Sequence, residues 1–382
     1  MRIAGVGLAM IEKLRTYLAR DSLCTNVGHS HHSKNCLLLY ISLPFRRKTV
    51  GSTHQNLLQV RELAKVIGEY GYNVDVMDFD DQLVRLKKKY DLVIDLHPGL
   101  NQVYRNNLNE DCLKVAYITG SNPSFANQAE AQRIEDLFSR KGVRLRPRRQ
   151  SPPFPKDLLE SFDAMFFIGN PYNLETYNEF KFKKIFLIKN TGFDQLRNQD
   201  FSKKNPNNFL FLGSVGQVHK GLDLLLDVFS KNAHLNLYIC ANYKGEKDFC
   251  KLYRQELFNL PNVFPYGFID VTSDRFRNLA AICSYTVMPS CSEGISGGVL
   301  AAMSAGLIPI VSRECGLNPD EVHFFEENNY VCIAETLNYF AQQPLDKIQA
   351  EALKTMDIIR DNYSMSNFSQ SLRVAMAGLL QQ

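Results

Sequence analysis

The sequence predicts an α/β protein made of two doubly wound, Rossmann-like domains that face each other across a cleft. Three observations indicate this fold class. Short apolar runs alternate with amphipathic helical patterns along the chain. The alternation is interrupted by a polar, basic seam over residues 189–208 and then starts again. A chain of 382 residues is also longer than one ordinary hydrophobic core serves.

The first domain is expected over residues 1–195. It begins its alternation with CLLLYISLP at 36–44, an apolar run ended by proline, which is typical of a strand buried on both faces of a parallel sheet. NLLQVRELAKVIGEYG at 56–71 has apolar residues near helical spacing and a glycine at its end, so we expect a helix. Four later runs are predicted strands: NVDVMDF, YDLVIDL, KVAYIT and DAMFFIG.

The second domain is expected over residues 205–364. Its predicted strands are NFLFLGS, LNLYICA, NVFPYGF, SYTVMPS and GLIPIVS, and its predicted helices include GLDLLLDVFSK, a segment near 249–260 and VCIAETLNYFAQ. A helical tail runs to Gln382. Two such halves imply a cleft between them, where ligands commonly bind.

Composition restricts the classes of partner. The net charge of +4 is compatible with anionic small molecules or with loose contact at a membrane surface, but it is too small to indicate nucleic acid binding. No run approaches the roughly 18 apolar residues of a membrane span. We interpret MRIAGVGLAMIEKLRTYLAR at 1–20 as an amphipathic helix rather than a signal peptide. The nine cysteines form no CxxC pair, as expected for reduced thiols. We therefore expect a cytoplasmic protein, with peripheral contact at the inner membrane face left open.

Two loops carry the strongest functional signal. In NFLFLGSVGQVHKGLDLLLDVF at 208–229, a strand leads through a glycine-containing loop to a helix, with His219 and Lys220 at the helix entrance. Backbone amides at a helix start, beside a lysine, favour an anion such as phosphate, although a turn with a capping lysine is the alternative. In SCSEGISGGVLAAMSAGLIPIV, Glu293 follows a strand and glycines begin the next helix. Glu293 is able to accept hydrogen bonds from sugar hydroxyls, and a tight turn with a surface glutamate is the alternative.

These motifs resemble a known family. GSVGQVHKGLDLLLDVF, PNVFPYGF and MPSCSEGISGGVLAAMSAGLIPIVS, in that order, look like the donor-binding domain of the GT-B glycosyltransferases of family 4 (glycosyl transferases group 1). The tail NYSMSNFSQSLRVAM resembles their closing helix, expected over 365–382 and crossing back onto the first domain. The resemblance covers residues 208–380 well, and the first domain more loosely, through VGSTHQNLLQVRELAKVIGEYGYNVDV and YDLVIDLHPGL.

The resemblance implies transfer of a sugar from a nucleotide-sugar donor to a glycan, lipid or small-molecule acceptor, with retention of anomeric configuration and with no metal or cofactor. Lys220 would neutralise the donor diphosphate, and Glu293 would hold the hydroxyls of the transferred sugar. His97 in DLHPG would bind the acceptor or polarise the leaving group. The other residues expected at the donor are Gly213, Ser214, Gly216, His219, Ser292, Gly294, Ser296, Gly297 and Gly298.

Four first-domain residues are expected on the acceptor side of the cleft. The resemblance places Gly51 and Ser52 there. His54 is either a cleft residue or a polar residue at the start of a helix, and Asn122 is either a sugar contact or a turn residue.

Departures from the family pattern leave other functions open. A second glutamate is usual eight positions after the first, where this chain has Ala301, and SVGQVH lacks the arginine usually found before the lysine. His219 is a hypothetical second, pH-dependent positive charge. The alternatives are a catalytically silent GT-B scaffold that binds a glycan, nucleotide or protein, and a nucleotide-sugar epimerase on the same fold.

Three further segments allow two interpretations each. The histidines of GHSHHS at 28–33 suggest a metal site or a surface loop, and we favour the loop. DFDD at 78–81 resembles an acidic metal motif, but capping of a predicted helix over QLVRLKKKY is the simpler explanation. RLRPRRQSPPFP at 144–155 is interpreted as a solvated loop rather than an anion site. We therefore predict no metal.

Overall fold

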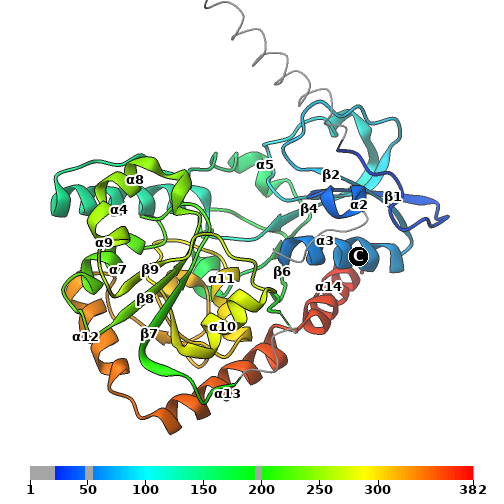
Figure 1. The fold of residues 1–382 in the computed structure, drawn as a ribbon. Coiled ribbons are helices and arrows are strands. Elements are labelled where there is room, and N and C mark those ends of the chain that lie inside the picture. Colours follow the sequence, from blue (N-terminus) through cyan, green and yellow to red (C-terminus); the bar gives the residue numbers. More distant parts are fainter. Residues whose placement is uncertain (1–21, 48–54, 194–199, 382) are drawn as a thin grey trace, which may run out of the picture.

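The computed structural model describes residues 22–47, 55–193 and 200–381. These residues form two parallel six-stranded sheets, each covered by helices, which lie side by side (Figure 1). The predicted amphipathic helix at 1–20 and the residues Gly51, Ser52 and His54 lie outside the described residues. No helix within the described ranges is both long and apolar enough to cross a membrane.

The first sheet has the strand order β2-β1-β3-β4-β5-β6. The side chains of Leu37, Leu38 and Leu39 in β1 are fully buried, because both faces of the strand are covered. Helices α3 and α14 pack on the face of Leu38, and irregular segments that contain Val84 and Tyr104 pack on the face of Leu37 and Leu39. Its strands are β1 Lys34–Tyr40, β2 Tyr72–Asp78, β3 Tyr90–Asp95, β4 Leu108–Ile118, β5 Ala164–Phe167 and β6 Ile185–Leu187, and its helices are α2 Leu43–Arg46, α3 Gln55–Glu69, α4 Pro123–Lys141, α5 Lys156–Glu160 and α6 Pro171–Glu175.

The second sheet has the order β12-β11-β10-β7-β8-β9. Its strands are β7 Asn205–Leu212, β8 Asn236–Cys240, β9 Val263–Pro265, β10 Cys283–Met288, β11 Ile308–Val311 and β12 His323–Phe324. Its helices are α7 Leu222–Phe229, α8 Lys247–Leu252, α9 Arg254–Phe258, α10 Asp274–Ile282, α11 Gly297–Ser304, α12 Tyr330–Ala341 and α13 Leu345–Asn362. Strand order reverses between β7 and β10, so the loops that follow these two strands flank the switch point, where ligands bind in such sheets.

Helix α4 belongs to the first half of the sequence but packs on the second domain. Ile134 and Leu137 of α4, with Leu145 beyond it, are buried in the same apolar cluster as β7, β10 and α7. Arg140 and Lys141 at the end of α4 pair with Asp223 on α7 and Glu256 on α9, and Figure 1 shows α4 well away from β1 and β2. The division between the two sheets therefore lies near the predicted seam, whereas α4 precedes the seam in sequence and packs on the second domain.

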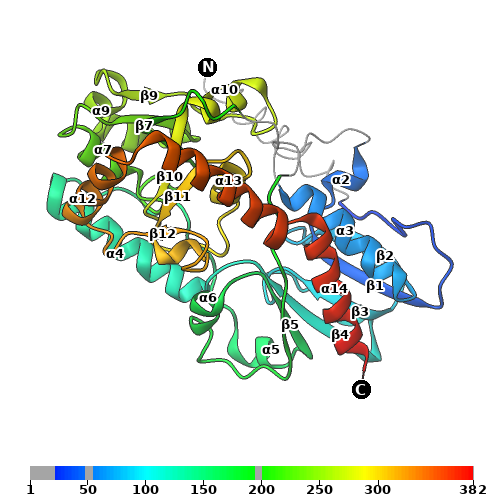
Figure 2. The ribbon, with the colours of Figure 1, turned by 90° about the horizontal axis from the view of Figure 1, so that it is seen from below.

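The chain also returns in the opposite direction at its C-terminus. Helix α13 runs along the second domain, and α14 Met365–Leu380 continues from it onto α3 and β6 of the first (Figure 2). Phe368, Leu372 and Met376 are fully buried in the first-domain core. This crossing holds the two domains together on the side opposite to α4.

The structure corrects the helix predicted for QLVRLKKKY, because residues 82–89 form no helix. The preceding aspartates consequently have other partners. Asp78 accepts a hydrogen bond from the Ser42 amide (2.7 Å) and pairs with Arg46, and Asp81 accepts one from the Ser22 hydroxyl (2.7 Å). They fix local loops rather than cap a helix.

Candidate active site

A cavity of about 630 Å³ lies between the two domains, at the carboxyl ends of strands from both sheets. The loops after β7 and β10 form one wall, and the loops after β3 and β4 contribute to the other. The predicted site residues that line it are His97, Gly213, Ser214, His219, Lys220, Ser292, Glu293, Gly294, Ser296, Gly297 and Gly298.

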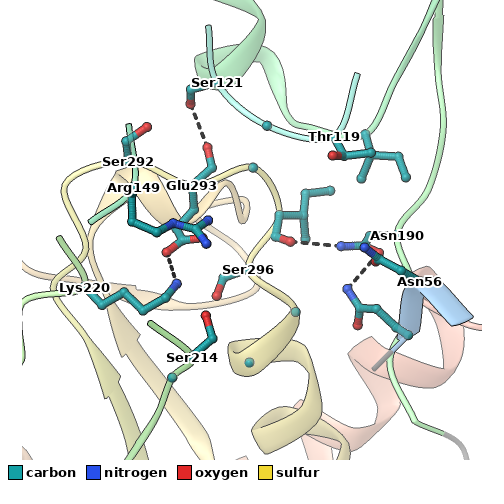
Figure 3. A pocket seen from close by; sticks show the side chains of 18 of the residues that line it. Asn56, Thr119, Ser121, Arg149, Asn190, Ser214, Lys220, Ser292, Glu293 and Ser296 are labelled. Carbon is teal, nitrogen blue, oxygen red and sulfur yellow. Dashed lines mark hydrogen bonds and ion pairs between the residues drawn. The ribbon is translucent and has the colours of Figure 1, made fainter. Parts of the chain in front are cut away.

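Lys220 and Glu293 meet at the floor of this cavity. The Lys220 ammonium donates to Glu293 Oε1 (Figure 3). The Ser290 hydroxyl donates to the same oxygen at 3.1 Å. Burial raises the pKa of Glu293, but the positive charges of Lys220 and Arg149 outweigh burial and bring that pKa down to about 2. Glu293 is therefore an ionised acceptor of hydrogen bonds and a weak base.

The start of α11 opens onto the same floor. Its N-cap residue Ser296 makes no capping bond, because the hydroxyl of Ser296 contacts Met288 Sδ at 3.4 Å instead. A Cβ at Gly298 would lie 2.6 Å from the Leu212 carbonyl oxygen, so this helix start packs against β7 as only glycine allows. The amides of a first helical turn have no acceptor within their own helix, which leaves an anion-binding position at the cavity.

The loop after β7 differs from the sequence expectation. The amides of Gly216 and Gln217 donate to the carboxylate of Glu246, at 2.6 Å and 3.2 Å. Glu246 is buried, and Gly216 does not line the cavity. These two amides are therefore already occupied by an internal carboxylate, and Gly216, expected at the donor, lies outside the cavity lining.

His219 is also placed differently from the hypothesis of a second positive charge. Its ring is buried, and Nε2 donates a hydrogen bond to the Ser292 carbonyl oxygen at 2.5 Å. Burial lowers the pKa of His219, although the nearby Glu293 opposes the shift. The neutral ring is favoured, and its bond to Ser292 joins the loop after β7 to the loop after β10.

Arg149 supplies a cation that the sequence interpretation did not assign to the site. It lines the cavity, and Figure 3 shows Arg149 and Lys220 approaching Glu293 from different sides. The carboxylate of Glu130 on α4 accepts hydrogen bonds from the amides of Arg148 (2.8 Å) and Arg149 (3.1 Å). Most of the basic segment at 144–155, Arg149 included, is exposed as expected, and Arg149 is the residue of its basic part that also lines the cavity.

The first-domain wall contains His97, with its ring centroid 4.8 Å from that of Phe154. Within the described part of the chain, neither ring nitrogen of His97 has a hydrogen-bond partner, although both are buried. Burial lowers the pKa of His97, so the neutral form is favoured. Its ring is thus available to a ligand that fills the cavity.

Asn122, expected on the acceptor side, does not line the cavity. It caps α4: its side-chain oxygen accepts from the Ser124 amide (2.9 Å), and its amide group donates to the Thr176 carbonyl oxygen (3.0 Å) and to Glu179 (2.9 Å). The turn interpretation therefore holds, because these bonds leave no donor for a sugar.

Two further cavity residues were missed by sequence reasoning. Gln55, at the start of α3, donates to Asn190 Oδ1 at 3.1 Å, and Asn190 donates to the Ile295 carbonyl oxygen at 2.9 Å. Together with the Ser121 hydroxyl, which donates to the Glu293 carbonyl oxygen (2.6 Å), these bonds join the first domain to the loop after β10. The position of Gln55 next to His54 in GSTHQN was the available signal.

Ala301 lines the cavity where the family pattern has a second glutamate. Its neighbours in the apolar cluster include Phe193, Ile269 and Val271, which also line the cavity. This part of the wall is apolar. Across residues 22–47, 55–193 and 200–381, no group of three or more His, Cys, Asp or Glu side chains is arranged to hold a metal ion.

Comparisons with known proteins agree with this architecture. Residues 192–343 match the family model of glycosyl transferases group 1. No curated protein sequence matches the chain. The chain is similar in structure to sucrose-phosphate synthase from Thermosynechococcus elongatus, with a TM-score of 0.64 at 14% identity over 91% of this chain and 99% of that one. HepE of Anabaena, solved with UDP and glucose, gives a TM-score of 0.58 at 13% identity over 91% and 100%. At these identities the likeness shows the fold, so the predicted GT-B architecture and the resemblance to glycosyl transferases group 1 are confirmed.

Proposed function

We propose, for a GT-B chain whose second domain matches glycosyl transferases group 1, that the protein transfers a sugar from a nucleotide-sugar donor to an acceptor held by the first domain. One observation carries the proposal. Lys220, Glu293 and the first turn of α11 converge on a cavity at the switch point of the second sheet. This set offers a cation and helix amides to a phosphate, and an ionised carboxylate to sugar hydroxyls.

The chemical role of the site is electrostatic. When the bond between the sugar and the nucleotide breaks, negative charge develops on the departing diphosphate. Lys220 and the amides at Gly297 and Gly298 are already in place to stabilise that charge, so little reorganisation accompanies the reaction. With a pKa of about 2, Glu293 is too weak a base to remove an acceptor proton and instead orients the transferred sugar.

The acceptor is proposed to enter from the first-domain side. His97, Phe154 and Tyr177 line that wall, and the unpartnered nitrogens of His97 suit an acceptor hydroxyl or the leaving group. We propose a glycan, lipid or small-molecule hydroxyl as the acceptor and retention of anomeric configuration, as the family resemblance implies. The anomeric proton coupling in an NMR spectrum of the product tests the stereochemistry.

The activity is tested with a panel of nucleotide sugars: UDP-glucose, UDP-N-acetylglucosamine, GDP-mannose and ADP-glucose. Release of the nucleoside diphosphate is measured for the full chain and for Lys220→Ala, with thermal shifts recorded in parallel. We expect at least one donor to stabilise the protein and to release its nucleotide in a Lys220-dependent manner. A panel that neither binds nor reacts would overturn the proposal.

A catalytically silent scaffold is the second candidate. The apolar wall at Ala301 favours it, because no carboxylate is available there to hold a ribose. A scaffold would bind a nucleotide or glycan without releasing nucleotide. An epimerase would change the sugar of the donor with no acceptor present, so product analysis of the same reactions distinguishes the three.

A further inference from the structure

The charge at the cavity depends on a residue from the first half of the chain. Among the described residues that line the cavity, Lys220, Arg149 and Glu293 are the side chains with a permanent charge. Lys220 and Glu293 form an ion pair, so the second domain contributes no net charge through its side chains. A diphosphate ester is strongly anionic. The positive charge that would attract it therefore comes from Arg149.

The backbone and the side-chain stem of Arg149 are held in place, although the residue is exposed. Besides the two amide bonds to Glu130, the side chain of Gln150 donates to Glu130 Oε2 at 2.9 Å, and Glu130 itself is 1% exposed. A Cβ at Gly216 would lie 2.6 Å from Arg149 Cγ, so the stem of Arg149 packs directly on the loop after β7. Glycine at 216 leaves the space through which the arginine reaches the cleft.

Helix α4 in turn fixes Glu130 against the second domain. Arg133 of α4 donates to the Pro289 carbonyl oxygen at 3.0 Å, in the segment that joins β10 to Glu293. Arg140 pairs with Asp223 and Asp227 on α7. The same helix thus contacts the elements that carry both donor-side loops, and it delivers Arg149 between them.

From these contacts we propose that Arg149 binds the donor diphosphate together with Lys220, as a second cation supplied by α4 and the loop that follows it. The inference rests on the proposed function and adds to it. A guanidinium presents a planar fork of donors that matches two phosphate oxygens, whereas the ammonium of Lys220 acts as a point charge. Arg149 therefore selects a diphosphate over a nucleoside that lacks phosphate, and it couples donor binding to the contact between the domains.

The test compares Arg149→Ala and Arg149→Lys with wild type in calorimetric titrations of UDP, GDP, ADP, their nucleosides and inorganic pyrophosphate. Arg148→Ala is the matched control, because Arg148 pairs with Asp248 outside the cavity and its amide bond to Glu130 is unaffected by truncation. We expect Arg149→Ala to weaken the diphosphate that binds by roughly tenfold or more. Arg149→Lys should recover part of the affinity, and Arg148→Ala should stay within about twofold of wild type.

The outcomes separate this inference from the proposed function. If wild type binds a nucleoside diphosphate and Arg149→Ala binds it equally well, the role of Arg149 is overturned and the function stands. If wild type binds no nucleoside diphosphate, the proposed function is overturned, and the role of Arg149, which rests on it, is overturned with it. An equal loss for nucleoside and diphosphate would also overturn the inference, because it would show a general disturbance of the cleft. Thermal unfolding of each variant identifies loss of folding.

Discussion

Lys220 and Glu293 lie 73 positions apart in the sequence and form an ion pair at the floor of the interdomain cavity. Their side chains are only 6% and 10% exposed. Each follows a different strand at the point where strand order reverses, β7 for the lysine and β10 for the glutamate. The pair holds the carboxylate ionised before any ligand arrives, and a bound diphosphate would compete for the same lysine.

Lys220→Ala is expected to reduce kcat/KM for sugar transfer by roughly a hundredfold or more, the usual effect of removing a group that stabilises charge in the transition state. Steady-state kinetics with the identified donor measure the change. Lys244→Ala is the control, because Lys244 is exposed and does not line the cavity. A loss in kcat/KM of less than threefold for Lys220→Ala would show that the lysine does not stabilise charge in the transition state.

Glu293→Gln is expected to change how stability depends on pH under acid conditions. The folded-state pKa of Glu293 is about 2, below its ordinary value of 4.5, so the ionised form is stabilised by folding. That contribution is complete above pH 4.5 and is lost as the pH falls towards 2. The difference in free energy of unfolding between wild type and Glu293→Gln should therefore be constant from pH 5 to 7 and shrink below 4.5. Urea unfolding across this range measures it, and a difference that persists at low pH would contradict the assignment.

His219→Gln is expected to act in a different pH window. Burial lowers the pKa of His219 from its ordinary value of 6.5, so below pH 6.5 the unfolded chain takes up a proton that the folded chain does not. Wild type should therefore lose stability relative to His219→Gln as the pH falls below 6.5. Glutamine retains a donor for the Ser292 carbonyl oxygen. Equal pH profiles for the two proteins would show that the ring is not kept neutral.

Arg140→Ala is expected to destabilise the protein by about 3 kcal/mol, because it leaves the fully buried Asp223 without its partner. Arg144→Ala is the control: Arg144 pairs with Glu135 at an exposed position, where the loss should stay within about 0.5 kcal/mol. The free energy of unfolding from urea titration compares them. Similar values for both variants would show that α4 is not held to the second domain by this ion pair.

Local patterns in the sequence predicted most of the sheet strands. Apolar runs such as CLLLY and NFLFL become β1 and β7 because a strand covered on both faces must be apolar throughout. Lys220 and Glu293 were predicted from motifs whose residues are close in sequence. The helix predicted at 82–90 is wrong. The charges of this segment resemble those of an exposed helix face, but residues 82–89 are irregular in the structure. Asn122, Pro123 and Gly142 are capping signals that indicate the ends of α4. They do not indicate that the helix packs on the second domain.

The sequence by itself determined the α/β class, the restart of the alternation after the seam, and the two glycine-containing loops that follow β7 and β10. These depend on periodicity and on residues within about twenty positions of each other. Only the tertiary structure decided which groups share the cavity. In the structure the Gly216 amide donates to Glu246, burial lowers the pKa of His219, and Arg149 lines the same cavity as Glu293. Each of these depends on which distant segments pack together and on how much water their packing excludes, and no local pattern encodes either.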